Sequence, residues 1–375
     1  MGLEKKMLPW YIYGVCVWGC HLANSTTSTD MALSNALKIE YRQLGKSGLR
    51  VSVPILGAMS IGDPNWNGWP LGEEQALPLL KHAWDRGVNT WDTANVYSNG
   101  ESERIIGKAI KKYNIPRERL IILTKCYFLT HEESSANTFA MGYLKNTRDY
   151  VNQSGLGRQA IFNQVDASLK RLGTDYIDLL QIHRFDASTP VEETMEALND
   201  LVRMGKVRYL GASSMWTWQF QMMNYVAEKH GWTKFISMQN RMSLLYREEE
   251  REMLAYCNFA GIGVIPWGPL HAGYLARPLG TATPRNEALK GTGFDRVLTS
   301  TDKAIVNRVA EVAEHKKWTM SQVALAWILT KVSSPIVGLN KPERVDEAII
   351  GDKRLSSNEI AYLEELYRPL NVVGH

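Results

Sequence analysis

Residues 89–110 read NTWDTANVYSNGESERIIGKAI, and this stretch predicts a strand, a short connection and a helix in that order. The helix has a glutamate early and lysines late, which suits the helix dipole. Asn99 and Gly100 supply the turn chemistry that the connection needs. Asp92 and Tyr97 are not needed for the turn, so their presence on this connection requires another explanation.

The same strand-then-helix unit recurs along the chain. Strands are expected at 53–58, 89–94, 120–125, 176–183, 209–214, 235–240, 263–268 and 335–339. Helices are expected at 73–87, 102–113, 158–173, 191–206, 219–231, 248–261, 302–317, 320–331, 342–350 and 357–367. Continuous apolar strands are covered on both faces and therefore pair in parallel. Eight such repeats favour an α/β fold that closes into a (β/α)8 TIM barrel over an open doubly wound sheet.

Two additions to the barrel are expected at its ends. YRQLG and LRVS flank Lys46-Ser47-Gly48 and predict an N-terminal β-hairpin, and the last helices are extra C-terminal helices. Residues 1–38 are expected to form a disordered leader, followed by a single barrel domain over residues 39–375. The apolar run at residues 7–18 is too short to span a bilayer. Because the rest of the chain carries free thiols and looks like a cytosolic enzyme, the protein is expected to be cytoplasmic. The alternative is a secretory protein in which residues 1–23 act as a signal peptide.

Composition excludes several classes of function. The chain has 375 residues, of which 45% are hydrophobic and 22% charged, which is ordinary for a globular protein. A net charge of +4 without any block of like charges gives no reason to expect a nucleic-acid partner. The four cysteines are too few for a disulfide framework, and Cys16 and Cys20 have no second pair at ligand spacing, so no metal site is expected.

In a parallel barrel the functional residues lie at the C-terminal ends of the strands. Four polar residues occupy such positions here: Asp92, Tyr97, Lys125 and His183. Each has an ordinary structural explanation by itself, such as a turn-forming aspartate, a snorkelling lysine or a hydrogen-bonded core histidine. Because the barrel brings all four to one rim, they form a candidate set for proton transfer.

The pKa values indicate how this set would work. A free tyrosine titrates near 10, and a lysine ammonium beside Tyr97 would lower that pKa. Asp92 would hold Lys125 charged, and His183 would orient a carbonyl oxygen. Such a site protonates an oxygen while a hydride reaches the carbon. No side chain delivers hydride, so a cofactor must supply it.

Several motifs carry a resemblance to a known family. WDTANVYSNGESERIIGKAI, ILTK, RLGTDYIDLLQIHR, GKVRYLGASS and SPIVGLNKPERVDEAI together resemble the aldo-keto reductase superfamily over residues 40–370. Three further segments are similar in sequence to fungal members such as versiconal hemiacetal acetate reductase-like enzymes: LQIHRFDASTPVEETMEAL, GWTKFISMQN and LLYREEEREM. By this resemblance the catalytic tetrad is Asp92, Tyr97, Lys125 and His183. The implied activity is the NADPH-dependent reduction of aldehydes or ketones, with Tyr97 as the general acid.

The resemblance also implies the cofactor site. NADPH, or NADP+ after turnover, would lie extended across the barrel mouth, with Ser213 and Gln239 beside the nicotinamide and Trp267 stacked on it. Ser214 stands where the family usually has Asn, Trp267 replaces the more common Tyr, and Gly268 replaces a Ser. Lys341 and Arg344 suit the 2′-phosphate that distinguishes NADPH from NADH. The full set of expected cofactor residues is Gly57, Ala58, Met59, Asp92, Ser213, Ser214, Gln239, Trp267, Gly268, Pro269, Leu270, Gly273, Leu275, Gly338, Leu339, Asn340, Lys341, Arg344 and Glu347.

The substrate pocket is expected to be apolar and aromatic. The candidates that line it are Trp66, Tyr97, Tyr127, Phe128, His183 and Trp216, with Trp69 and Met215 as further candidates. Trp216 and Trp218 could instead pack on their own helix. The expected partner is a small carbonyl compound, and a pocket rich in tryptophan would suit a flat aromatic or polyketide-like one. No stable membrane span is expected. The oligomeric state stays open.

Two other functions remain open at this point. One is a cofactor-sensing regulatory barrel, similar to potassium-channel β subunits, that binds NADPH with little turnover. The other is a secreted binding barrel, which would require cleavage of the leader.

Overall fold

The computed structural model describes residues 39–281, 287, 291 and 297–375. The predicted leader, with Cys16 and Cys20, lies outside these described residues. The eight predicted barrel strands are present, and each pairs in parallel with its neighbours in the order β10-β3-β4-β5-β6-β7-β8-β9. Their bounds are β3 Ile55–Gly57, β4 Thr90–Asp92, β5 Ile121–Cys126, β6 Ile177–Ile182, β7 Val207–Ser213, β8 Phe235–Gln239, β9 Gly263–Val264 and β10 Ile336–Gly338.

The ring of strands closes between the end of β9 and the start of β10. The Ile336 N–H donates a hydrogen bond of 2.9 Å to the Pro266 carbonyl, and a parallel bridge joins Trp267 to Ile336. Closure joins the two end strands of the eight-stranded sheet, and it brings the C-terminal ends of all eight strands to one rim. The fold is the predicted (β/α)8 TIM barrel.

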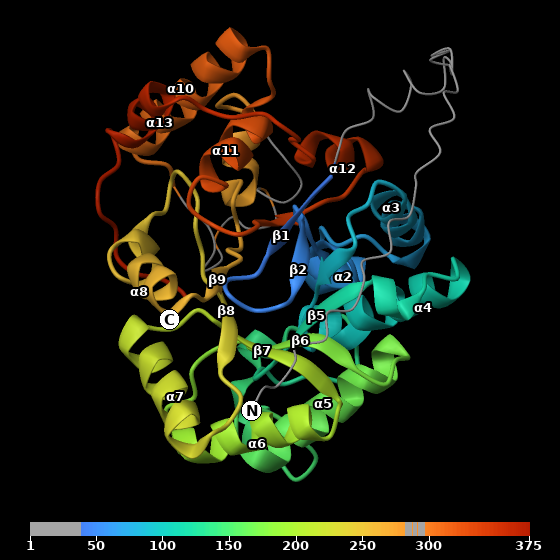
Figure 1. Cartoon of the computed structure of the whole chain (residues 1–375). Coiled ribbons are helices and arrows are strands. Elements are labelled where there is room, and N and C mark those ends of the chain that lie inside the picture. Colours follow the sequence, from blue (N-terminus) through green and yellow to red (C-terminus); the bar gives the residue numbers. More distant parts are fainter. Residues whose placement is uncertain (1–38, 282–286, 288–290, 292–296) are drawn as a thin grey trace, which may run out of the picture. The chain divides into compact units, whose positions relative to one another are not determined.

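Helices surround the strands (Figure 1). Their inward faces are apolar; α4, for example, buries Ile105, Ile106 and Ala109. Their bounds are α2 Pro64–Asn67, α3 Glu73–Asp85, α4 Glu101–Lys112, α5 Arg158–Leu172, α6 Val191–Arg203, α7 Thr217–His230, α8 Met253–Ala260, α10 Ser300–Lys316, α11 Met320–Ile328, α12 Pro342–Ala348 and α13 Ser357–Glu364. Each predicted helix is present, with ends shifted by a few residues.

The predicted N-terminal hairpin forms the floor of the barrel. Strands β1 (Glu40–Gln43) and β2 (Arg50–Val53) pair antiparallel. Leu44, Leu49 and Val51 of the hairpin share one buried cluster with barrel residues Ile55, Leu123, Leu179, Ile265 and Ile336. This cluster fills one end of the barrel, so the polar residues at the C-terminal strand ends surround the opposite end.

The floor requires a close approach of two backbones. The Lys46 N–H donates 2.7 Å to the Gly261 carbonyl. A Cβ at Gly263 would lie 2.4 Å from Leu44 Cδ1 and 2.8 Å from the Gly45 nitrogen. Glycine at position 263 therefore lets the hairpin turn sit against the start of β9.

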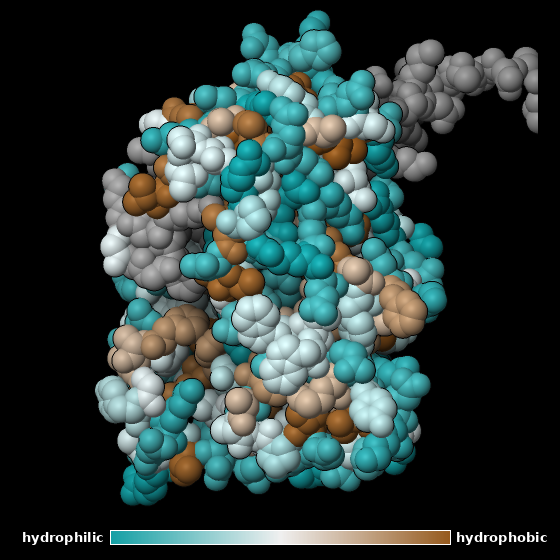
Figure 2. Space-filling model, turned by 90° about the vertical axis from the view of Figure 1, so that its left-hand side faces the viewer, coloured by the Kyte–Doolittle hydropathy of each residue, from teal (hydrophilic) through white to brown (hydrophobic). Residues whose placement is uncertain are grey.

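The surface drawn in Figure 2 mixes hydrophilic side chains with small, separate apolar patches. Among the described residues visible on that face, no single large apolar area of the kind that marks a docking surface is seen. Among the described residues, no helix is both long enough and apolar enough to cross a membrane.

Candidate active site

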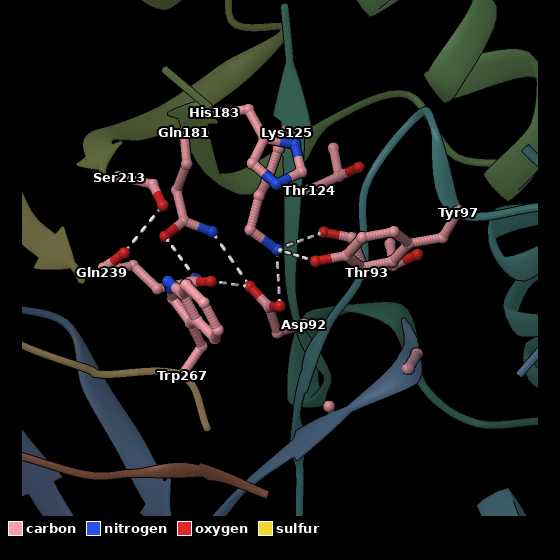
Figure 3. A network of polar contacts seen from close by, with 12 residues as sticks. Asp92, Thr93, Tyr97, Thr124, Lys125, Gln181, His183, Ser213, Gln239 and Trp267 are labelled. Atoms are coloured by element: carbon pink, nitrogen blue, oxygen red, sulfur yellow. Dashed lines mark hydrogen bonds and ion pairs between the residues drawn. The ribbon is translucent and has the colours of Figure 1, made fainter. Parts of the chain in front are cut away.

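The four residues of the predicted tetrad meet at the C-terminal rim (Figure 3). Asp92 ends β4, Lys125 lies in β5, His183 follows β6, and Tyr97 begins the 3-10 turn η2 (Tyr97–Gly100). The Lys125 ammonium donates 2.6 Å to Asp92 Oδ2 and 3.2 Å to the Tyr97 hydroxyl. All four side chains are buried. Lys125 thus connects the carboxylate to the phenol.

A tight turn fixes the position of Tyr97. Ser98 and Asn99 have φ of 46° and 49°, and Gly100 has φ of 89°. This left-handed conformation is costly for most residues but is tolerated by asparagine and glycine. The Asn99 side-chain amide also donates 2.8 Å to the Ala136 carbonyl, which ties the turn to the connection after β5. Asn99 is therefore both a turn former and an anchor.

The second oxygen of Asp92 accepts two amides. Gln181 Nε2 and Gln239 Nε2 lie 3.0 and 2.9 Å from Asp92 Oδ1, and Gln239 Nε2 also donates 2.8 Å to Gln181 Oε1. With Lys125 on Oδ2, both carboxylate oxygens are occupied. Gln181 was not among the predicted site residues. It precedes His183 by two positions, and that spacing on a strand places both side chains on one face.

Charge in this network follows from burial and proximity. Burial acts to lower the pKa of Lys125, but the Asp92 carboxylate and the Tyr97 phenol together outweigh it, and the pKa of Lys125 is raised. Burial raises the pKa of the Tyr97 phenol, although the Lys125 ammonium acts to lower it. The expectation that lysine lowers the tyrosine pKa on balance is therefore wrong for the site without ligands. Tyr97 carries its proton at neutral pH and is ready to donate it.

His183 is a neutral side chain next to the phenol. Burial, reinforced by the charges of Lys125 and Arg184, holds the pKa of His183 well below its usual range. Its ring lies edge-on to Tyr97, with the ring centroids 5.9 Å apart. Its Nδ1 atom is buried and has no hydrogen-bond partner among the described residues. Because buried polar atoms are normally paired, this imidazole is suited to a ligand.

The residues predicted beside the nicotinamide lie next to the tetrad. Ser213 Oγ donates 2.7 Å to the Gln239 carbonyl, and the Ser214 N–H donates 2.6 Å to Asn240 Oδ1. The Trp267 indole N–H donates 3.2 Å to Ser214 Oγ. These bonds join the ends of β7 and β8 to the chain after β9. They fix one edge of a half-buried indole that a flat ring could stack on.

The remaining predicted cofactor residues lie along the same rim. Gly57 ends β3, and Ala58 and Met59 follow it; Gly268, Pro269, Leu270, Gly273 and Leu275 follow β9; and Gly338, Leu339, Asn340, Lys341, Arg344 and Glu347 run from the end of β10 into α12. The Leu275 side chain is fully buried in the core, which leaves only its backbone for a ligand. Arg344 forms an ion pair with Glu347 in the same helix, and Lys341 is exposed.

Most of the aromatic residues predicted to line the pocket gather on one side of Tyr97. Trp66 and Tyr97 share a small cluster with Phe128 packed against it, and Tyr127 lies edge-on to Phe128. The Trp66 indole N–H is buried without a partner among the described residues. Such a wall of rings suits an apolar ligand.

The other tryptophans and Met215 differ in their surroundings. Trp216 is 45% exposed and contacts the His375 ring, with centroids 4.9 Å apart, while Trp218 is 60% exposed. Neither side chain is therefore buried against its own helix. Met215 is fully buried in the core, so its proposed place in the pocket lining is wrong.

No group of three or more His, Cys, Asp or Glu side chains that could hold a metal ion occurs among the described residues. Cys126 and Cys257 are buried free thiols, and burial raises the pKa of each to about 12.

Comparisons with known proteins agree with the geometry. Residues 55–368 match the family model described as the Aldo/keto reductase family. The chain is 53% identical over 347 residues to an aldo-keto reductase of Fusarium vanettenii, covering 90% of this chain and 94% of that protein. It is 52% identical over 350 residues to the aldo-keto reductase dtxS3 of Metarhizium robertsii, covering 90% and 94%. It is 51% identical over 337 residues to versiconal hemiacetal acetate reductase of Aspergillus parasiticus, covering 88% and 98%.

Proposed function

Because the chain belongs to the aldo-keto reductase family, we propose that this oxidoreductase is an NADPH-dependent reductase of aldehydes and ketones in which Tyr97 is the general acid. The observation that carries this proposal is the Lys125 ammonium, which contacts both Asp92 and the Tyr97 hydroxyl. A phenol in this position keeps its proton until a negative charge develops on a nearby oxygen. The ammonium then stabilises the phenolate that remains.

The residues of the rim are compatible with a nicotinamide cofactor. Family membership supports such a cofactor, and the half-buried Trp267 indole, held by Ser214, offers a surface for a flat ring. A bound reduced nicotinamide would supply the hydride that no side chain can supply. We assign the preference for the 2′-phosphate to Lys341 and Arg344, since both are cations beside the chain that leaves β10.

Each tetrad residue then has one task at the substrate carbonyl. Tyr97 donates its proton to the carbonyl oxygen, and the neutral His183 imidazole donates a hydrogen bond that orients the same oxygen. Lys125 stabilises the charge on Tyr97, and Asp92 keeps Lys125 charged and in place. The two amides on Asp92 prevent that carboxylate from rotating.

The substitution Tyr97→Phe tests this assignment. It removes the acid but keeps the ring, so we expect kcat to fall by about 10²–10⁴-fold while NADPH binding is retained. Turnover is followed by the absorbance of the reduced nicotinamide with a panel of aldehydes and ketones, and binding by fluorescence titration. Repeating the titration with NADH tests the cofactor preference.

Tyr113→Phe is a matched control, because Tyr113 caps the far end of α4, away from the tetrad. A Tyr97→Phe enzyme that still turns over at the wild-type rate would contradict the proposal. Tight NADPH binding by the wild type without turnover of any compound in the panel would favour a cofactor-sensing barrel instead.

A further inference from the structure

Arg184 is a partly buried cation beside the tetrad. It follows His183 directly, and its guanidinium Nη1 donates 2.6 Å to the His183 carbonyl. In the part of the chain that the structure describes, no carboxylate forms an ion pair with it. The acid closest along the chain, Asp186, accepts bonds from the Leu156 and Ser188 N–H groups instead. Burying part of a guanidinium without a counter-charge costs free energy. We therefore expect an anion from outside the chain to pair with Arg184.

The guanidinium lies among the residues of the candidate substrate pocket. It sits over the Phe128 ring at 5.6 Å, and that ring in turn lies 4.9 Å from the His183 ring. Burial lowers the pKa of Arg184, and the phenols of Tyr97 and Tyr127 oppose this shift. The guanidinium therefore lies close enough to both phenols to interact with them electrostatically. Arg184 therefore borders the aromatic wall beside the proton donor.

The position of Arg184 in the barrel separates it from the candidate cofactor residues. Apart from Asp92, those residues lie at the ends of β3, β7, β8 and β10 or in the segments after β3, β7, β9 and β10, whereas Arg184 follows β6 and Phe128 follows β5. Strands β5 and β6 are neighbours, on the side of the tetrad away from the β9–β10 closure. An anion bound by Arg184 would consequently belong to the substrate.

We propose that Arg184 binds a carboxylate of the substrate, so that the preferred substrates are flat carbonyl compounds that carry an acidic group. This inference rests on the proposed reductase function. The planar fork of a guanidinium matches the two oxygens of a carboxylate, and the aromatic wall matches a ring between the carboxylate and the carbonyl. Arg184 is thus the residue that sets specificity, while Tyr97 and His183 act on the carbonyl.

The test compares an acid with its neutral ester. For the wild type, we expect KM for 4-carboxybenzaldehyde to be about 10- to 100-fold below KM for its methyl ester, as one charge-assisted contact implies. Arg184→Met should remove most of this difference by raising KM for the acid far more than KM for the ester, while any change in kcat should be the same for both compounds. Arg184→Lys should give an intermediate KM, because it keeps the charge without the fork. Arg208→Met is the matched control, since Arg208 is exposed at the start of β7.

Benzoate binding provides a readout that does not depend on turnover. In the presence of NADP+, benzoate should bind the wild type with an affinity that falls as salt rises, and should bind Arg184→Met about 10-fold more weakly or worse. An equal loss for acid and ester, an unchanged benzoate affinity in both Arg184 variants, or a loss of NADPH affinity instead would overturn the proposal. If no carbonyl compound is reduced but benzoate binding depends on Arg184, the reductase assignment fails and the anion site stands.

Discussion

At the scale of single residues, the two amides on Asp92 are the least expected part of the site. Gln181→Met keeps the volume of the side chain but removes one buried donor to a carboxylate and the acceptor of Gln239. We expect the free energy of unfolding to fall by about 1–3 kcal/mol, and kcat to fall because Asp92 and Lys125 are held less firmly. Urea denaturation measures the first effect and steady-state kinetics the second. Gln159→Met on the exposed face of α5 is the control, and equal behaviour of the two variants would refute a positioning role for Gln181.

The titration of Glu249 is expected to make the stability of the fold depend on pH. It lies in the turn η6 (Glu248–Glu250) and accepts 2.5 Å from Asn240, and burial raises its pKa to about 7. A carboxyl group with a raised pKa in the folded state stabilises the fold fully below its unfolded pKa of 4.5, and this contribution is lost as the pH rises through 7.

Glu249→Gln keeps the acceptor and the shape but cannot ionise. Relative to wild type, we expect it to gain up to about 3 kcal/mol of unfolding free energy between about pH 4.5 and about pH 8. Urea denaturation across that range measures the difference. The gain should be absent in Glu118→Gln, because Glu118 lies in an exposed turn before β5. A pH-independent difference between Glu249→Gln and wild type would show that Glu249 does not titrate in this range.

The residues that the sequence predicted and those that it missed differ in kind. Asp92, Lys125 and His183 interrupt apolar strands at their ends, so a polar residue there is visible as an anomaly. Gln181 lies inside a strand and Arg184 after it, and neither position is unusual until the barrel shows what surrounds it. The pKa of Tyr97 was predicted with the wrong net direction because the sequence reveals the neighbouring lysine but not the degree of burial.

At the scale of elements, a buried ion pair holds α4 and α5 together behind the tetrad. Arg171 Nε donates 2.6 Å to Glu103 Oε2, and Thr124 Oγ1 donates 2.6 Å to Glu103 Oε1. Glu103 is fully buried, and Thr124 precedes Lys125 in β5. This link therefore sets the distance between the helix that follows Tyr97 and the strand that carries Lys125.

Arg171→Met breaks this link and leaves a buried carboxylate without its partner. We expect a loss of about 3–5 kcal/mol in unfolding free energy, measured by urea denaturation. The double variant Glu103→Gln with Arg171→Met should recover part of the loss, because no charge is then left unpaired. Arg104→Met removes the more exposed pair with Glu101 and should cost less than about 1 kcal/mol. A loss of that small size for Arg171→Met would contradict the role of the pair.

Element boundaries departed from the sequence prediction where backbone chemistry intervened. The strand expected at 263–268 is regular only over Gly263–Val264. Pro266 has no N–H to donate, so its position offers only a carbonyl to the β10 side, where it accepts from the Ile336 N–H. The Ile265 and Trp267 N–H groups still reach the Met238 and Asn240 carbonyls on the β8 side. The short turns Thr138–Ala140 and Gly142–Asn146 after β5 carry no periodic apolar pattern, which is why they were not predicted.

At the scale of the whole molecule, the barrel separates stability from chemistry. Asp92 and Gln239 are 147 positions apart in the chain, yet their side chains lie 2.9 Å from each other. Only the rule that parallel strands end on one rim made such a pairing predictable from the sequence. The hairpin and its apolar cluster lie at the opposite end, and the residues of that cluster include none of the tetrad.

This separation predicts that damage to the floor lowers stability without altering catalysis by the folded enzyme. Leu44 is fully buried between the hairpin and the barrel, so Leu44→Ala should cost about 2–5 kcal/mol through lost burial and the cavity left behind. Met204→Ala truncates a side chain that is 56% exposed and should cost little. Thermal denaturation and steady-state kinetics, measured well below the melting transition, distinguish the two effects. A Leu44→Ala enzyme whose kcat falls along with its Tm would mean that the floor and the mouth are coupled, because a rigid barrel would otherwise keep the Lys125–Tyr97 contact unchanged.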